Sequence, residues 1–224
     1  MDARSGWAVG LAALAASLLV AACDDTNPPS PLPATRDPNQ SLTLAPTAFL
    51  LRPDQMPGYT RSNSATLSAD TLASELGDPS LAPRVQSQGL TYGNRYTYMA
   101  PQAAPDSTPF REVVSEALIF QTSSGAAAFA GDEKVRQDKA PEKGGTVAAL
   151  PGVASTNADE VTGFYATAPD SDQTTPPLSY LVVARRGRVV VELLASGTVA
   201  NATRAQFDAL LADQEGFLAQ SPDA

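Results

Sequence analysis

The stretch LSYLVVARRGRVVVELLAS, residues 178–196, decides the fold of this chain. Two runs of apolar, largely β-branched residues flank the segment Arg185-Arg186-Gly187-Arg188. This pattern predicts a β-hairpin with a tight turn near Arg186 and Gly187. Because consecutive residues on both arms are apolar, we expect these two strands to be central in a sheet and covered on both faces.

Segments typical of strands and of helices surround this hairpin. Alternating or β-branched residues predict further strands at residues 58–67, 90–98, 113–121, 146–150 and 161–166. Capping residues and helical spacing predict helices at residues 69–76, 79–88, 124–138 and 202–220, the first of them with Ser68 as its N-cap. The apolar face of the last helix comprises Phe207, Leu210, Leu211, Gln214 and Leu218. The order of these elements predicts an α+β fold, an antiparallel sheet with helices packed on one face, in a single domain over residues 44–221.

The first 22 residues have the layout of a secretory signal, with Arg4 near the start, an uncharged segment and small residues at its end. Residues 20–23, VAAC, resemble the lipobox of bacterial lipoproteins. That resemblance implies cleavage before Cys23 and a diacylglycerol on its thiol, which would anchor the protein to a membrane. A plain cleaved signal and an uncleaved anchor are the alternatives. Residues 23–43, rich in proline and polar residues, are expected to form a disordered tether.

Composition limits the chemistry that the domain can perform. The chain has a formal charge of −9 and contains no histidine, and Cys23 is its only cysteine. Nucleic-acid binding needs basic patches, so an acidic chain argues against it. Without histidine there is no Ser-His-Asp or Cys-His pair, and one cysteine excludes disulfides and thiolate zinc sites. We therefore expect no catalytic residue, no metal ligand and no cofactor.

Two groups of side chains are candidates for ligand binding. On a regular strand Tyr92, Tyr96 and Tyr98 share one face, where they could stack on a flat ligand or pack beneath a helix. A dense basic cluster lies at the hairpin tip and comprises Arg185, Arg186 and Arg188. These side chains could bind a carboxylate or phosphate, or could form a charged turn without a ligand.

Acidic residues occur in pairs that could in principle act as general acid and base. These pairs are Glu112 with Glu116 and Asp132 with Glu133, and they are expected to be solvated charges on a strand edge and a helix surface. Asp170 and Asp172 could contribute oxygen ligands to a calcium site, but they lack the longer ordered series ending in glutamate that an EF-hand loop needs, and are interpreted as an acidic loop.

Two segments resemble known extracytoplasmic families. VVSEALIFQTSSGAAAFAG, residues 113–131, is similar to the extracellular sensor domain of mycobacterial receptor kinases, which carries paired cysteines that are missing here. RRGRVVVELLASG, residues 185–197, is similar to the closing hairpin of PsbP-like lipoprotein domains. Neither resemblance implies a catalytic residue.

We therefore expect a membrane-anchored extracytoplasmic lipoprotein whose domain is a non-catalytic binding or sensor module for a small ligand or a protein partner. The alternative is a carboxylate-dependent hydrolase acting on cell-envelope polymers. A pocket walled by tyrosines would favour binding, and two carboxylates facing each other across a groove would favour hydrolysis.

Overall fold

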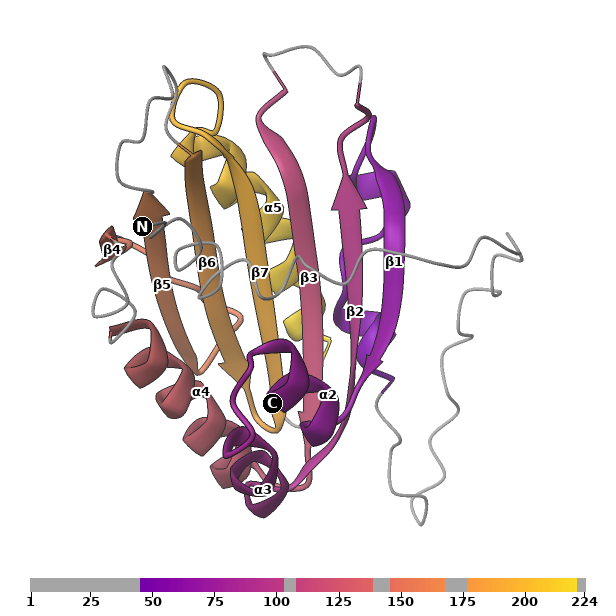
Figure 1. The fold of residues 1–224 in the computed structure, drawn as a ribbon, viewed down its shortest axis with the longest axis vertical. Coiled ribbons are helices and arrows are strands. Elements are labelled where there is room, and N and C mark those ends of the chain that lie inside the picture. Colours follow the sequence, from indigo (N-terminus) through magenta and orange to yellow (C-terminus); the bar gives the residue numbers. More distant parts are fainter. Residues whose placement is uncertain (1–44, 103–107, 139–145, 168–176, 221–224) are drawn as a thin grey trace, which may run out of the picture.

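The computed structural model describes residues 45–102, 108–138, 146–167 and 177–220. Seven antiparallel strands form one sheet in the order β1-β2-β3-β7-β6-β5-β4, with helices packed against it (Figure 1). The predicted α+β class with an antiparallel sheet is confirmed. The predicted signal segment, Cys23, the predicted tether and the residues interpreted as an acidic loop, Asp170 and Asp172, lie outside the described residues.

The hairpin predicted from residues 178–196 forms the middle of the sheet. Strands β6 (Pro177–Arg186) and β7 (Val189–Thr198) pair along their whole length, and Arg186 lies opposite Val189. The turn therefore consists of Gly187 and Arg188, and Gly187 has a φ of 53°. A left-handed conformation at this position suits glycine and matches the twist of the flanking strands.

The remaining strands extend the sheet from both sides of this hairpin. Strand β7 pairs with β3 (Phe110–Phe120), which is followed outward by β2 (Leu90–Met99) and β1 (Thr60–Leu67). On the other side β6 pairs with β5 (Glu160–Thr167), and β5 pairs with the short edge strand β4 (Thr146–Ala149). All the residues of β7 up to Ala195 are buried, so the central strand is covered on both faces, as its sequence predicts.

Helices lie on both faces of the sheet. Helices α2 (Ala69–Glu75), α3 (Leu81–Ser87) and α4 (Ser123–Asp138) cover the front face in Figure 1, and α5 (Arg204–Leu218) lies behind it. Phe129 of α4 packs with Val190 of β7, whereas Phe207 of α5 packs with Leu193 on the opposite face of that strand.

The prediction that helices pack on one face only is therefore wrong. Successive residues of β7 point to opposite sides, and both sets are largely apolar, so each face needs its own cover. Helix α5 supplies the second cover, together with two short 3₁₀ helices, η2 (Pro46–Phe49) and η3 (Pro53–Gln55), and the buried residues Leu50 and Leu51 between them.

Helix starts follow local capping chemistry. The backbone N–H of Thr71 donates to the Ser68 hydroxyl at 3.2 Å, which confirms Ser68 as the N-cap of α2. Helix α5 begins in the same way, because Thr203 and Gln206 form a capping box. Helix α3 begins at Leu81 instead of the predicted Pro79, and Asp78 accepts hydrogen bonds from the backbone and hydroxyl of Ser80.

Candidate functional site

A row of three charged residues crosses the middle of the sheet on the face beneath α2, α3 and α4. Arg95 of β2 lies directly opposite Glu116 of β3, and Glu116 lies directly opposite Glu192 of β7. Their exposed fractions are 3%, 2% and 6%, respectively. Buried charges are costly unless they are paired, so the partners of each member determine what this row can do.

Arg95 is shared by two carboxylates. Its Nε and Nη2 atoms lie 2.8 and 2.7 Å from Glu116 Oε2, and its Nη1 atom donates to Oε2 of Glu75, at the end of α2, at 2.6 Å. Burial lowers the pKa of the Arg95 guanidinium, but Glu116 and Glu75 more than offset this and raise it above its ordinary value. Arg95 therefore remains a cation and ties α2 to the sheet.

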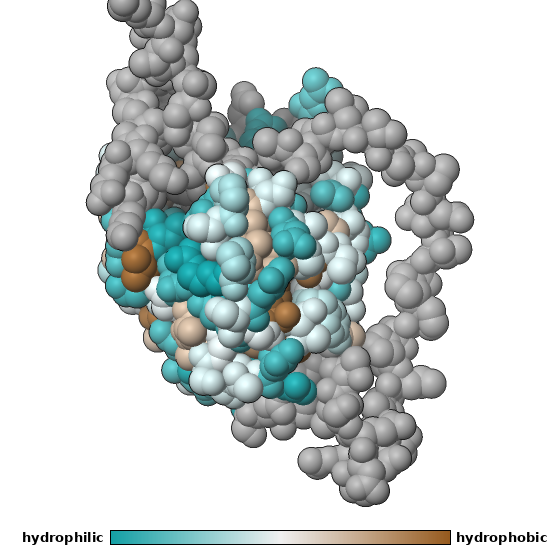
Figure 2. Space-filling view, turned by 60° about the horizontal axis from the view of Figure 1, so that its bottom comes forward, coloured by the Kyte–Doolittle hydropathy of each residue, from teal (hydrophilic) through white to brown (hydrophobic). Residues whose placement is uncertain are grey.

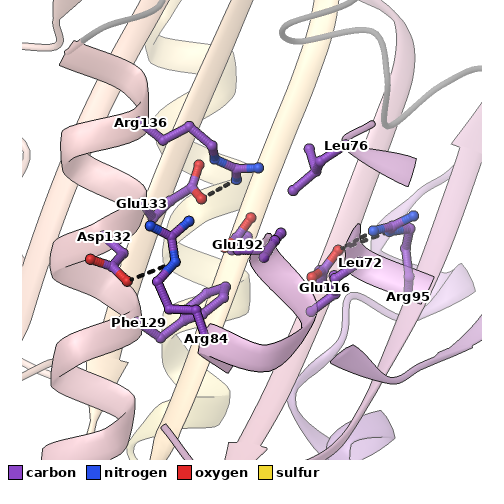
Figure 3. Close-up of a pocket in the computed structure, with 11 residues that line it drawn as sticks. Leu72, Leu76, Arg84, Arg95, Glu116, Phe129, Asp132, Glu133, Arg136 and Glu192 are labelled. Carbon is purple, nitrogen blue, oxygen red and sulfur yellow. Dashed lines mark hydrogen bonds and ion pairs between the residues drawn. The ribbon is translucent and has the colours of Figure 1, made fainter. Parts of the chain in front are cut away.

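Helix α4 brings a second ion pair over the same row. Glu133, 3% exposed, accepts hydrogen bonds from Arg136 and, at 2.8 Å, from the Gln137 side-chain amide. Burial lowers the pKa of the Arg136 guanidinium, but Glu133 and Glu192 outweigh this and raise it. Figure 3 shows this pair from α4 on one side of Glu192 and the Arg95–Glu116 pair on the other.

Glu192 lies between these two ion pairs (Figure 3), and no ion pair is formed by its carboxylate with the cations of the described segments. Its Oε1 atom is buried and has no hydrogen-bond partner within the ranges that the structure describes. Burial, followed by the charges of Glu133 and Glu116, raises the pKa of Glu192 well above its ordinary value, against the opposing effect of the two arginines. Burial also raises the pKa of Glu116, although Arg95 opposes that change. Glu192 is therefore the member of the cluster that most readily holds a proton.

A pocket opens beside this cluster. It is lined by Leu72, Leu76, Leu81, Arg84, Arg95, Glu116, Phe129, Asp132, Glu133, Arg136 and Glu192 (Figure 3). The space that the centre of a water molecule can occupy is about 20 Å³, and about 480 Å³ is empty when the open solvent at the mouth is included. The interior thus admits one or two water-sized groups. Arg84, which is exposed, and Asp132, which is half-buried, form a further ion pair, with Nε and Oδ2 3.4 Å apart.

This arrangement suits the binding of a small polar group better than hydrolysis of a polymer. Glu116 and Glu192 lie side by side on neighbouring strands, and Glu116 is already engaged by Arg95. A glycosidase needs its two carboxylates on either side of a bound sugar. The enclosed space between the side chains lining this pocket is too small for a sugar ring.

The predicted tyrosines lie on the other face of the sheet. Tyr92, Tyr96 and Tyr98 are opposite Ile119, Ser115 and Val113 of β3, on the side covered by α5 and the segment around Leu51. The Tyr98 hydroxyl donates to the Leu51 carbonyl at 2.7 Å, and burial raises the pKa of Tyr98 to about 12. The ring of Tyr96 meets that of Tyr98 edge-on, with centroids 6.5 Å apart. Tyr92 and Tyr96 are half-buried, and ligand binding by these three side chains stays a prediction.

The predicted arginines lie at the turn of the central hairpin and contact the segment before β5. Arg185 Nη1 lies 3.0 Å from Asp159 Oδ2, and Arg186 donates to the Asn157 carbonyl at 3.4 Å. The carbonyl of Arg188 accepts a hydrogen bond from the Phe120 N–H at 2.9 Å. These contacts stabilise the turn, and anion binding at this turn stays a prediction.

The predicted acidic pairs are only partly where they were expected. Glu112 and Asp132 are half-buried, but Glu116 and Glu133 are among the most buried charges described, so the interpretation of all four as solvated is wrong. Sequence reasoning missed Arg95 and Glu192 altogether. A signal was present, since VVVELLAS and VVSEALIF each place one glutamate inside an apolar strand where only a paired or protonated carboxylate is tolerated.

Two further kinds of feature, a membrane-spanning helix and a metal site, are absent from the described segments. No helix in them has the length and apolar character needed to cross a membrane. Nor does any group of three or more Asp, Glu, Cys or His residues in those segments have an arrangement that could hold a metal ion.

Comparison with known proteins gives a likeness in structure alone. No protein-family model matches the sequence, and no curated protein matches it. Among solved structures, the chain is similar to the crystal structure of the extracellular domain of PknH from Mycobacterium tuberculosis. The similarity covers 79% of this chain and 95% of that chain, with a TM-score of 0.50 and 13% sequence identity. The chain therefore shares its fold with the extracellular domain of a mycobacterial receptor kinase.

Proposed function

We propose that this protein is a membrane-anchored extracytoplasmic lipoprotein whose domain is a non-catalytic, sensor-like binding module. The observation that carries the proposal is the shared fold with the PknH extracellular domain, which spans nearly the whole of that domain. The resemblance of residues 20–23 to a lipobox is independent support for this location, because acylation of Cys23 would hold the domain outside the cytoplasm on a lipid anchor.

The buried cluster around Glu192 supports binding over catalysis. It combines a buried carboxylate whose Oε1 atom has no hydrogen-bond partner among the described residues, charged neighbours held in place by ion pairs, and room for a water-sized group. Pockets of this kind orient a small polar group precisely through a few convergent contacts.

The location is tested by intact mass and membrane fractionation of the full chain expressed in a bacterial host. We expect the wild-type protein to begin at Cys23, to carry diacylglycerol and acyl mass, and to sediment with membranes. A Cys23→Ala variant should lose the acyl mass and leave the membrane fraction, whereas a control substitution in the tether, Thr26→Ala, should change neither. A wild-type chain that keeps Met1, carries no acyl mass and stays in the soluble cytoplasmic fraction contradicts the proposal.

A further inference from the structure

We infer that the pocket beside Glu192 binds the ammonium group of a small primary amine, with the Glu192 carboxylate as its counter-ion. This inference rests on the proposed function as a binding module and names the chemical class of the ligand.

The first argument is the charge balance of the pocket. Three cations, Arg84, Arg95 and Arg136, and four anions, Glu116, Asp132, Glu133 and Glu192, line it. The lining therefore has one negative charge in excess when all seven groups are ionised. Glu75 adds to this excess, because it shares Arg95 with Glu116. One bound ammonium group would balance the seven charged groups of the lining and reduce the excess to which Glu75 contributes.

The second argument is the unequal pairing of these groups. Every arginine in the pocket is engaged with a carboxylate, Arg84 with Asp132, Arg95 with Glu116 and Arg136 with Glu133. Glu192 is the carboxylate left over, 6% exposed and without a hydrogen-bond partner for Oε1 in the described part of the chain. A buried acceptor without a partner is costly, and an added donor relieves that cost. Arg136 Nη1 also lacks a hydrogen-bond partner there, but its charge is already balanced by Glu133.

The third argument is size and the character of the walls. An ammonium group is about as large as a water molecule, which is what the enclosed space admits. The side chains of Leu72, Leu76 and Phe129 line the same pocket and offer apolar surface to a short aliphatic chain. The charged head would contact Glu192 while the hydrocarbon part lies against these side chains.

Binding is coupled to a proton. Without a bound amine Glu192 tends to keep its proton, first because it is buried and second because Glu133 and Glu116 repel its negative charge, against the opposing effect of Arg136 and Arg95. Taken together, Glu133 and Arg136 of α4, Glu116 of β3, Arg95 of β2, Glu75 of α2 and the Arg84–Asp132 pair carry more negative than positive charge. An arriving ammonium group replaces this proton, which leaves to solvent. We therefore expect amine binding to release a proton and to weaken as the pH falls.

Calorimetric titration of the full purified chain tests the inference, with n-butylammonium chloride as the probe. Sodium chloride at equal ionic strength and the neutral analogue 1-butanol serve as ligand controls. We expect saturable binding of n-butylammonium only, with proton release detected as a dependence of the heat on the ionisation enthalpy of the buffer. Saturable binding of 1-butanol with equal affinity, or no binding of n-butylammonium at any pH from 6 to 8, overturns the inference.

Two matched variants locate the site. Glu192→Gln keeps the shape of the side chain and removes its charge, and we expect it to weaken n-butylammonium binding by about tenfold or more, since a charge-assisted hydrogen bond is lost. Asp208→Asn makes the same change on α5, beyond the opposite face of the sheet, and should leave the affinity unchanged. Equal affinity in wild type and Glu192→Gln places the amine elsewhere and overturns the inference.

The outcomes separate this inference from the proposed function. If the chain is acylated and membrane-bound but does not bind n-butylammonium, the inferred ligand class is wrong and the proposed function still stands. A chain whose stability responds to pH through Glu192 but which binds no amine has a proton site alone, and that result also overturns the inference.

Discussion

Arg95 and Glu192 are two buried charges in one cluster with opposite energetic roles. Arg95 has two carboxylate partners at hydrogen-bonding distance, so its charge is compensated. Glu192 has no such compensation in the described residues and is surrounded by more negative than positive charge. Removing the Arg95 guanidinium should therefore destabilise the fold, whereas neutralising Glu192 should stabilise it.

Stability should fall as the pH rises from 5.5 to 8, and Glu192 should be a main cause. Its pKa is higher in the folded than in the unfolded chain, so folding takes up a proton. Its stabilising contribution is complete below about pH 4.5, the ordinary value for a glutamate, and is lost as the pH rises through the folded pKa. Each proton taken up on folding lowers the free energy of unfolding by at most about 1.4 kcal/mol for each unit by which the pH rises.

Urea denaturation at several pH values measures this slope. Glu192→Gln should be more stable than wild type at pH 8 and should have a flatter pH dependence. Some slope should persist, because burial raises the pKa of Glu112, Glu116 and Glu215 as well. A wild-type stability that rises with pH over this range would contradict the argument.

Removing the Arg95 guanidinium should be among the most damaging single changes in the domain. Arg95→Met leaves Glu116 buried without its cation, and breaking a buried pair in this way costs about 3–5 kcal/mol. Lys134→Met is the matched control, because Lys134 pairs with Asp138 on the exposed side of α4 at 2.9 Å, and such pairs contribute about 0.3–0.5 kcal/mol. Urea denaturation at pH 7 compares the two, and equal losses would mean that the buried pair contributes no more than the surface one.

At the scale of the element, helix α4 is held close to α3 by a glycine in its first turn. A Cβ on Gly125 would overlap the carbonyl oxygen of Gln88, which follows the last residue of α3. The Gln88 side-chain amide also donates to Asp132 of α4 at 2.8 Å. Gly131, further along α4, has open space where a Cβ would lie. A side chain at position 125 would therefore disturb the packing of α3 against α4, whereas a side chain at position 131 would not.

Alanine at these two positions should shift stability in opposite directions. Gly125→Ala should cost about 1–3 kcal/mol, because α3 and α4 must move apart around the new methyl group. Gly131→Ala should gain about 0.4–1 kcal/mol from the higher helix propensity of alanine and the smaller entropy of the unfolded chain. Thermal unfolding of both variants measures the difference, and a stabilising Gly125→Ala would show that the contact between the helices is not tight.

At the scale of the whole molecule, the sheet joins two parts of the chain along β3 and β7. Strands β1 to β3 come from the first half of the domain and β4 to β7 from the second, so the Glu116–Glu192 neighbours lie on the seam between them. Gln214 of α5 donates from the opposite face to the carbonyl oxygens of both residues, at 3.2 and 3.4 Å. The charged row thus sits where all layers of the fold meet.

The outer surface over α2, α3 and α4 is mostly polar. Figure 2 shows this end of the molecule with its apolar residues as separate spots. The large apolar side chains exposed on the described residues are Val135 and Val199, at 50% and 52%. The described part of this face therefore carries small, separate apolar spots and no broad apolar patch (Figure 2).

The amino-acid sequence by itself determined the central hairpin, the positions of most strands and helices and the α+β class. These features depend on local signals, namely β-branched runs around Gly187, the period of two in Leu90–Met99, and the cap at Ser68. Each acts over a few residues and can be identified without knowing what packs against it.

Only the tertiary structure decided the candidate site and the placement of α5. Arg95 and Glu116 are 21 positions apart in the sequence, and Glu192 joins them only through the register of β3 with β7. Register and the choice of face depend on how separate apolar surfaces fit together, and no local pattern encodes that fit. For this reason the glutamates of VVSEALIF and VVVELLAS can be seen as unusual in the sequence, but only the fold brings them side by side.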